Sequence, residues 1–292
     1  MADFIRRLPY TPIVLGAALY LLNEGPDSLR VPVLDRLRES LTAFITTAAY
    51  DAVWYTNSFL NNSALNNFLS ADTSNWNWSQ EIAVVTGGCS GLGKGFTERL
   101  VARGVRVAVL DVSPAPADFK SNPRITVFTC DVTNPDDVKA VANQVRETVG
   151  HPSILVNNAG IAQSHSILNT PPKWLQSIMG VNLMAHWYTA QEFVPHMVAQ
   201  KKGHIVTLAS MASFVASPGM VDYAATKAAV QAFHEGLRAE LRSFHQCPEI
   251  HMTIVHPIWV ATPMVAKYKE RLEKAGQQVM EPKVIIDAVA NQ

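Results

Sequence analysis

Short apolar runs alternate with amphipathic segments from residue 81 to the end of the chain. An apolar run without polar alternation indicates a strand buried on both faces, and the amphipathic segments between such runs supply the helices that cover it. The sequence therefore predicts an α/β fold with a doubly wound parallel sheet, whose ligands bind at the carboxyl ends of the strands. The expected strands are Ile82–Thr86, Val105–Asp111, Ile125–Cys130, Ile154–Asn157, His204–Leu208 and Ile250–Val255. The main expected helices are Leu92–Arg103, Pro135–Val149, Trp174–Val198 and Asp222–Phe244.

The composition changes near residue 80, which predicts a helical N-terminal extension over residues 1–80 and a separate α/β domain over residues 81–292. In the extension, Leu34, Leu37 and Leu41 recur at steps of three and four residues, as on one face of a helix.

Residues 41–60 are almost uncharged and carry aromatic side chains such as Tyr50 and Trp54, whereas residues 61–80 have the Asn- and Ser-rich composition of a linker. Two interpretations stay open. The extension is an anchor at a membrane interface, with its aromatic rings at headgroup level, or a set of helices folded onto the next domain or a partner subunit. The apolar run Ile13–Leu22 is too short for a transmembrane helix and has no clean signal cleavage site after it.

The charge balance and the cysteines narrow the class of protein. Lys plus Arg equals Asp plus Glu at 24 each, so nothing indicates a nucleic-acid partner. Cys89, Cys130 and Cys247 are scattered without paired or metal-ligand spacing. They are expected to be reduced structural thiols, and no metal site is expected.

A glycine-rich turn, Thr86–Gly93, joins the first expected strand to the first helix. Its glycines allow a tight turn and close approach to a pyrophosphate, which the free N–H groups of the helix attract. Asp111 ends the second strand, where a carboxylate can bond both hydroxyls of an adenosine ribose and repel a 2′-phosphate. Lys94 follows the turn, but no cation lies inside it. NAD is therefore favoured over NADP as the cofactor, with NADP left open.

Tyr223 and Lys227 stand four residues apart in an expected helix, so both side chains share one face. A free phenol has a pKa of about 10 and is a poor base at neutral pH, but a neighbouring ammonium favours the phenolate. Ser210 follows the fifth strand and can hold a substrate oxygen. Asn182 is a polar residue in an apolar helical stretch.

These residues occur together in an order that resembles the short-chain dehydrogenase/reductase superfamily, over residues 81–292. The motifs that carry the resemblance are Thr86-Gly87-x-x-x-Gly91-x-Gly93, Asp131, Asn157-Asn158-Ala159-Gly160, Asn182, Ser210 and Tyr223-x-x-x-Lys227.

The resemblance implies roles for four catalytic residues. Tyr223 would be the acid/base, and Lys227 would lower its pKa and bind the nicotinamide ribose. Ser210 would orient the substrate, and Asn182 would sustain a water-mediated proton relay through the lysine.

A Rossmann-type domain that binds NAD(P) is also implied. Asp131 and Val132 would contact adenine, Asn158 would lie along the cofactor, and the segment Pro257–Thr262 would surround the nicotinamide carboxamide. The full set of implied cofactor-binding residues is Thr86, Gly87, Ser90, Gly91, Leu92, Gly93, Asp111, Asp131, Val132, Asn158, Ala159, Gly160, Tyr223, Lys227, Pro257, Val260 and Thr262.

Within the superfamily, the chain is similar to the retinol and 17β-hydroxysteroid dehydrogenase branch, whose members associate with membranes or lipid droplets. The similarity implies an alcohol dehydrogenase or carbonyl reductase that acts on a lipophilic compound such as a retinoid, a steroid, a fatty alcohol or a polyketide-like ketone. It also implies a place on the cytosolic face of the endoplasmic reticulum or of lipid droplets, or otherwise in the cytoplasm, and a homodimer. The alternatives are a non-catalytic dinucleotide-binding scaffold and a membrane-recruited binding protein.

Three segments are expected to bound the substrate pocket: Ile161–Ser166, Ser213–Met220 and the residues after Thr262. Its expected apolar side chains are Met220, Trp259, Met264 and Tyr268. The sequence departs from the family in two respects. Ile258 stands where glycine is common, and no seventh strand is evident, so the sheet is expected to lack its last edge strand.

Overall fold

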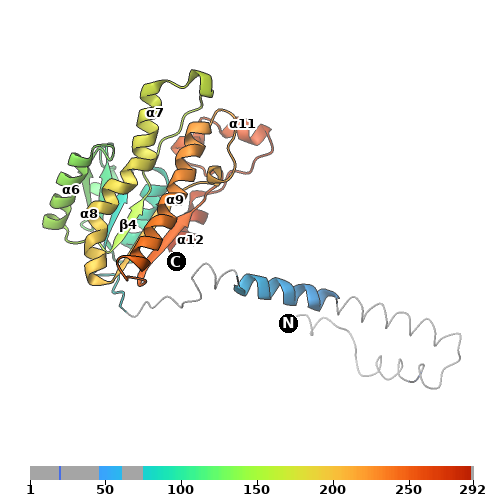
Figure 1. The fold of residues 1–292 in the computed structure, drawn as a ribbon, viewed down its shortest axis with the longest axis horizontal. Helices are drawn as coiled ribbons and strands as arrows, with labels where there is room; N and C mark the ends of the chain where they lie inside the picture. The colour runs from blue at the N-terminus through green and yellow to red at the C-terminus, as the bar shows by residue number, and fades with distance from the viewer. Residues whose placement is uncertain (1–19, 21–45, 61–74, 291–292) are drawn as a thin grey trace. The chain divides into compact units, whose positions relative to one another are not determined.

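The computed structural model describes residues 20, 46–60 and 75–290 (Figure 1). The chain divides into two units, Met1–Asn75 and Trp76–Gln292. In the first unit, residues 46–60 form a helix with exposed side chains. The apolar run Ile13–Leu22, except for Tyr20, and the expected helical pattern over Leu34–Leu41 lie outside the described residues. Among the helices that are described, none combines the length and apolar character that crossing a membrane requires.

The second unit is built on a parallel sheet of six strands in the order β3-β2-β1-β4-β5-β6. The strands are β1 Ile82–Thr86, β2 Arg106–Asp111, β3 Ile125–Thr129, β4 Ile154–Asn157, β5 Gly203–Leu208 and β6 Ile250–Val255. The bounds of β1, β4 and β6 are those expected from the sequence, and each other strand differs by one residue at one end. Every residue of β1 and β4 is buried, as the continuous apolar runs predict.

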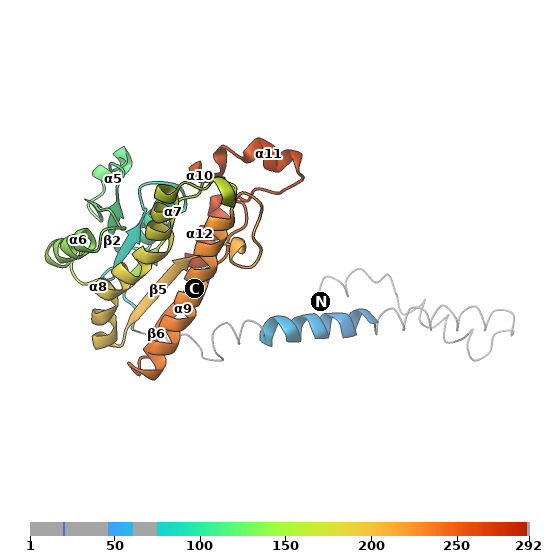
Figure 2. The same cartoon turned by 45° about the horizontal axis from the view of Figure 1, so that its top comes forward.

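Helices cover both faces of the sheet (Figures 1 and 2). One face packs against α6 Pro135–Thr148, α8 Ala185–Gln200 and α9 Val221–Ser243. The other packs against α4 Gly91–Ala102, α5 Ala117–Lys120 and α12 Pro282–Ala290. Successive strand residues alternate between the two cores, since side chains in a strand point to opposite faces. Val84 belongs to the first core and Val85 to the second.

The expected single helix Trp174–Val198 is instead three consecutive segments. It begins as α7 Pro172–Met179, continues as the π-helical turn η2 Gly180–Met184 and becomes α8. Asn182 lies within this turn and is fully buried. A π turn changes the direction of side chains without interrupting the apolar pattern, so periodicity did not reveal it; such turns are frequent at functional sites.

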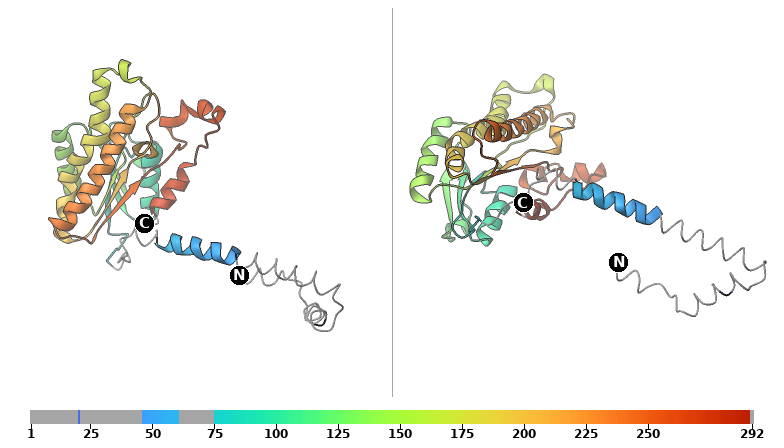
Figure 3. Two further views of the ribbon diagram at one scale, coloured as in Figure 1. Left: turned by 45° about the vertical axis from the view of Figure 1, so that its right-hand side comes forward. Right: turned by 60° about the horizontal axis from the view of Figure 1, so that its bottom comes forward.

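The sheet ends at β6 on one side, and no seventh strand pairs with it within residues 75–290. The last described helix, α12, packs on α4 instead (Figure 3). Gly95 permits this close approach, because a Cβ there would collide with Ile286. Arg99 and Asp287 form an ion pair of 3.3 Å across the same contact.

Short elements complete the loops at the carboxyl ends of the strands. They are η1 Ile167–Asn169, η3 Met211–Ser213, α10 Pro263–Ala266 and α11 Lys269–Lys274. At the opposite end, Trp76 packs against the α4-side core and Arg103 lies over the ring of Trp78 at 5.3 Å. The residues just before β1 therefore pack onto the α/β unit.

Candidate active site

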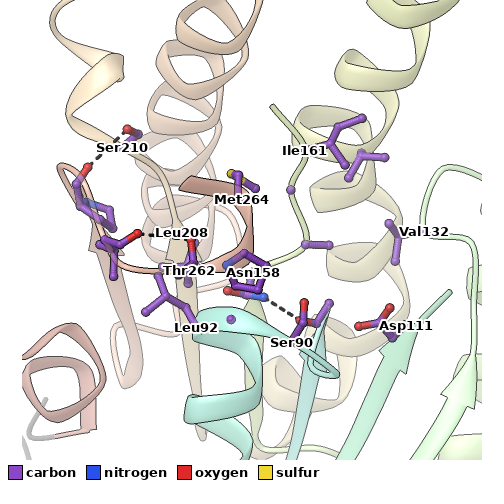
Figure 4. Close-up of a pocket in the computed structure, with 18 of the residues that line it drawn as sticks. Ser90, Leu92, Asp111, Val132, Asn158, Ile161, Leu208, Ser210, Thr262 and Met264 are labelled. Atoms are coloured by element: carbon purple, nitrogen blue, oxygen red, sulfur yellow. Dashed lines mark hydrogen bonds between the residues drawn. The ribbon is translucent and has the colours of Figure 1, made fainter. Parts of the chain in front are cut away.

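A cavity of about 360 Å³ opens at the carboxyl ends of the strands. Figure 4 shows Ser90 and Asp111 at one end of it, Ser210 at the other, and Asn158 and Thr262 between them. Most of the site residues expected from the sequence line it: Gly87, Ser90, Gly91, Leu92, Asp111, Asp131, Val132, Asn158, Ala159, Gly160, Ser210, Tyr223, Lys227, Pro257, Val260 and Thr262. Three expected residues, Thr86, Gly93 and Asn182, lie outside this lining. The lining residues that sequence reasoning missed include Leu110, Ser113, Val181, Leu208 and Ala209.

The glycine-rich turn has the backbone shape that its sequence predicts. Gly87 and Gly91 have φ angles of +63° and +53°, which favour glycine. A Cβ on Gly93 would collide with the carbonyl of Gly87, so this glycine permits the close packing of helix on turn. Ser90 precedes α4 and makes no side-chain cap, which leaves the first helical N–H groups available to an anion at the pocket. The turn therefore fits a pyrophosphate.

Hydrogen bonds of Thr86 and Asn158 hold this turn against the loop after β4. Asn158 donates from Nδ2 to the carbonyls of Thr86 at 2.9 Å and Gly87 at 3.1 Å. The hydroxyl of Thr86 accepts from the backbone N–H groups of Asn158 and Ala159, both at 3.0 Å. These bonds tie β1 to β4, the two central strands, and Thr86 itself is not among the lining residues of the pocket.

Asp111 is held in place at the end of β2. Its carboxylate accepts from the N–H of Cys89 at 2.9 Å and the N–H of Ser113 at 2.8 Å. Burial, together with this carboxylate, raises the pKa of the Cys89 thiol to about 12, so the thiol stays protonated.

Lys94, the cation that follows the glycine-rich turn, pairs with Asp118 at 2.9 Å, and that hydrogen bond raises the pKa of the lysine.

Tyr223 and Lys227 lie one turn apart on α9, with Nζ 5.7 Å from the centre of the phenol ring. Nζ donates to the carbonyl of Leu208 at 2.6 Å. Burial lowers the pKa of Lys227 to about 8, because the buried ammonium has lost its water.

Burial also raises the pKa of Tyr223, and a hydrogen bond with Ser210 offsets part of that rise. The sequence had suggested a lowered value. The direction differs because the phenolate is desolvated as well, and spacing along a helix carries no information on burial.

Ser210 and Asn182 approach this pair from different sides. Ser210 caps η3, accepting from the N–H of Ala212 at 3.1 Å and donating to the carbonyl of Pro257 at 3.3 Å. Asn182 binds both backbone groups of Ile161, accepting at 2.8 Å and donating at 3.0 Å. Its amide is thus fixed beneath the pocket rather than directed into it.

Gly160 marks the point where Asn182 and Lys227 converge. A Cβ there would lie 3.6 Å from Oδ1 of Asn182 and 3.8 Å from Nζ of Lys227. Both side chains therefore lie close to Gly160, in the loop after β4.

Some of the residues expected to bound the substrate pocket line this cavity. Ile161, Ile258 and Met264 line it, whereas Met220, Trp259 and Tyr268 are not among its lining residues. Ile258, which stands where the family commonly has glycine, is half exposed at the rim. No group of three or more His, Cys, Asp or Glu side chains within the described ranges is arranged to bind a metal.

The sequence family described as short chain dehydrogenase matches residues 81–273. Dehydrogenase RED2 from Cochliobolus heterostrophus is 37% identical over 235 residues, covering 80% of this chain and 88% of that protein. Retinol dehydrogenase 10-B from Danio rerio is 31% identical, covering 67% of this chain and 66% of that protein. Among solved structures, the aldohexose dehydrogenase of Thermoplasma acidophilum in ligand-free form aligns with a TM-score of 0.64 and 26% identity, covering 72% of this chain and 85% of that one.

Proposed function

The chain belongs to the short-chain dehydrogenase/reductase superfamily, in its retinol dehydrogenase-like branch. From this we propose that it catalyses reversible hydride transfer between NAD and a lipophilic alcohol or carbonyl compound. The observation that carries the proposal is the convergence of Ser210, Tyr223 and Lys227 on the pocket that contains the glycine-rich turn and Asp111.

The glycine-rich turn and Asp111 would hold the dinucleotide, which would supply the hydride donor or acceptor. The phenol oxygen of Tyr223 takes the proton of the substrate hydroxyl in oxidation and returns it in reduction. Ser210 turns its hydroxyl from the carbonyl of Pro257 to the substrate oxygen and orients it. The ammonium of Lys227 stabilises the phenolate by its charge, which acts strongly because burial removes the water that would screen it.

Asn182 supports a water-mediated proton relay at Lys227 without lining the pocket itself. By holding the backbone of Ile161 and lying next to Lys227 across Gly160, it keeps the lysine end of the pocket open to a water-mediated relay. A non-catalytic scaffold is less consistent with these contacts, since a protein that only binds a dinucleotide needs no serine, tyrosine and lysine at one point.

Two contacts support NAD rather than NADP. The carboxylate of Asp111, fixed by two backbone N–H groups, repels a 2′-phosphate and accepts from ribose hydroxyls. Lys94, the cation beside the turn, is drawn toward Asp118.

A lipophilic substrate is supported by the apolar side chains that line the pocket, among them Ile161, Ile258 and Met264. We also propose that the N-terminal extension, up to Asn75, serves as a membrane-interface segment and that the enzyme acts at the cytosolic face of the endoplasmic reticulum or of lipid droplets. The helix over residues 46–60 supports this, because its exposed side chains include Tyr50, Trp54 and Phe59 and its only charge is Asp51.

The test is cofactor-coupled turnover of the full chain with retinoids, steroids, fatty alcohols and short alcohols. We expect NADH to form with a lipophilic alcohol, at least about tenfold faster than NADPH forms from NADP, since an uncompensated charge repulsion of this kind exceeds one factor of ten. A chain that binds the cofactor but turns over no member of the panel would be a scaffold, and the proposal would be wrong.

A further inference from the structure

Trp174 connects α7 to the helix that carries the phenol. Its indole Nε1–H donates to Oδ2 of Asp222 at 2.6 Å. The other carboxylate oxygen of Asp222 accepts from the backbone N–H of Tyr223 at 2.8 Å. One carboxylate thus joins an indole on α7 to the residue proposed as the acid/base.

This contact is strong for three physical reasons. Hydrogen bonds to an ionised acceptor are shorter and stronger than neutral ones. The carboxylate sits in the first turn of α9, where the helix dipole favours a negative charge. Asp222 is only 9% exposed, so water cannot replace a lost partner.

Trp174 also contacts the loop that follows β4. Its ring lies 5.6 Å from the ring of His165, whose backbone N–H donates to the carbonyl of Gly219 at 3.0 Å. Gly219 has a φ of +80° and lies just before α9. The two segments expected to bound the substrate pocket, Ile161–Ser166 and Ser213–Met220, therefore meet the start of the catalytic helix at this tryptophan. The helices α7 and α9 lie side by side (Figures 1 and 2).

We propose that Trp174, acting through Asp222, is a positioning residue that sets where the phenol of Tyr223 stands relative to the substrate. This inference rests on the proposed function. Neither side chain lines the pocket, so both act on the reaction through the backbone of α9. When the indole N–H is removed, the carboxylate loses its partner on α7, and the first turn of α9 with Tyr223 shifts. Misplacements of about 1 Å are enough to lower a rate by one or two powers of ten.

The test replaces Trp174 by Phe, which keeps an aromatic ring and removes only the N–H donor. We expect kcat per cofactor-binding site to fall by about tenfold or more, while the Kd for NAD stays within about twofold because the glycine-rich turn is untouched. The matched control is Trp187→Phe. This indole on α8 lies with its ring 4.4 Å from the ring of Phe233, tilted by 56°, and the residue is 41% exposed; its replacement should leave kcat unchanged. Counting sites by bound cofactor separates a slower site from a smaller folded fraction.

A second variant, Asp222→Asn, tests the hydrogen bond between Trp174 and Asp222 directly. Asp222→Asn offers one oxygen where two donors now bind, so kcat should fall as well. The double variant should be no slower than the slower single variant, because both changes break the same connection. In a ¹⁵N–¹H spectrum, the indole resonance that disappears in Trp174→Phe should move upfield in Asp222→Asn and keep its place in Tyr223→Phe.

The positioning role is overturned if Trp174→Phe keeps the wild-type kcat per site, or if Trp187→Phe loses as much. If Tyr223→Phe is inactive while Trp174→Phe is fully active, the positioning role alone fails. If the wild-type chain has no turnover, or Tyr223→Phe retains it, the proposed function fails and the inference fails with it.

Discussion

At the scale of single residues, Lys227 is the group whose titration should be visible in the reaction. Its folded pKa is about 8, below the usual 10.5, because burial penalises the ammonium. The side chain is therefore charged below pH 8 and neutral above it. The charge that stabilises the phenolate is present at neutral pH and is lost as the pH rises through about 8.

We predict that kcat for carbonyl reduction, measured from pH 6 to 9.5, is level at low pH and falls about tenfold per unit above pH 8, as for loss of one proton. In Lys227→Arg the guanidinium stays charged over this range, so the fall should disappear although the rate is lower. The same fall in the arginine variant would assign the titration to another group.

The sequence predicted most of the residues that line the pocket and failed where a property depends on the fold. Spacing placed Tyr223 beside Lys227, but the rise in the pKa of Tyr223 comes from burial by distant segments. Leu208 takes part through its carbonyl, which carries no side-chain signal. Trp174 and Asp222 are 48 residues apart, so no local pattern links them.

At the scale of elements, β1 and β4 were predictable because each is an apolar run that is buried along its whole length. The π turn at Asn182 was not, because the apolar pattern passes through it unchanged. The contact of α12 with α4 depends on the missing side chain of Gly95, which a sequence shows as a helix-weakening residue and not as a packing site.

The helix over residues 46–60 is expected to bind the full chain to lipid vesicles. If its exposed aromatic side chains lie in a membrane interface, the full chain should co-sediment with phosphatidylcholine vesicles. Replacing Trp54 and Tyr55 by Asp should weaken binding by about tenfold or more, since each ring gives up the free energy of its burial. Phe244→Asp, at an exposed aromatic position directly after α9, is the control and should bind as the wild type does. Equal binding by all three proteins would contradict the interface role.

At the scale of the whole α/β unit, the site follows from topology. The strand order reverses between β1 and β4, and the chain leaves these neighbours in opposite directions. The crevice that forms at such a point is where ligands of doubly wound sheets bind. The glycine-rich turn follows β1 and Asn158 follows β4, so both sides of this crevice carry the motifs found in the sequence. The sequence predicted binding at the carboxyl ends of the strands, and the strand order places the site between β1 and β4.

The proposed reaction depends on Tyr223 moving the proton, and the most direct test is the rate of a single turnover with Tyr223→Phe. The variant keeps the ring and removes only the hydroxyl. With NAD and an alcohol that the wild-type chain accepts, we predict a rate lower by about 10² to 10⁴-fold, the usual contribution of a general acid/base, with the Kd for NAD within about twofold of wild type. A single-turnover rate equal to that of the wild type would contradict the account.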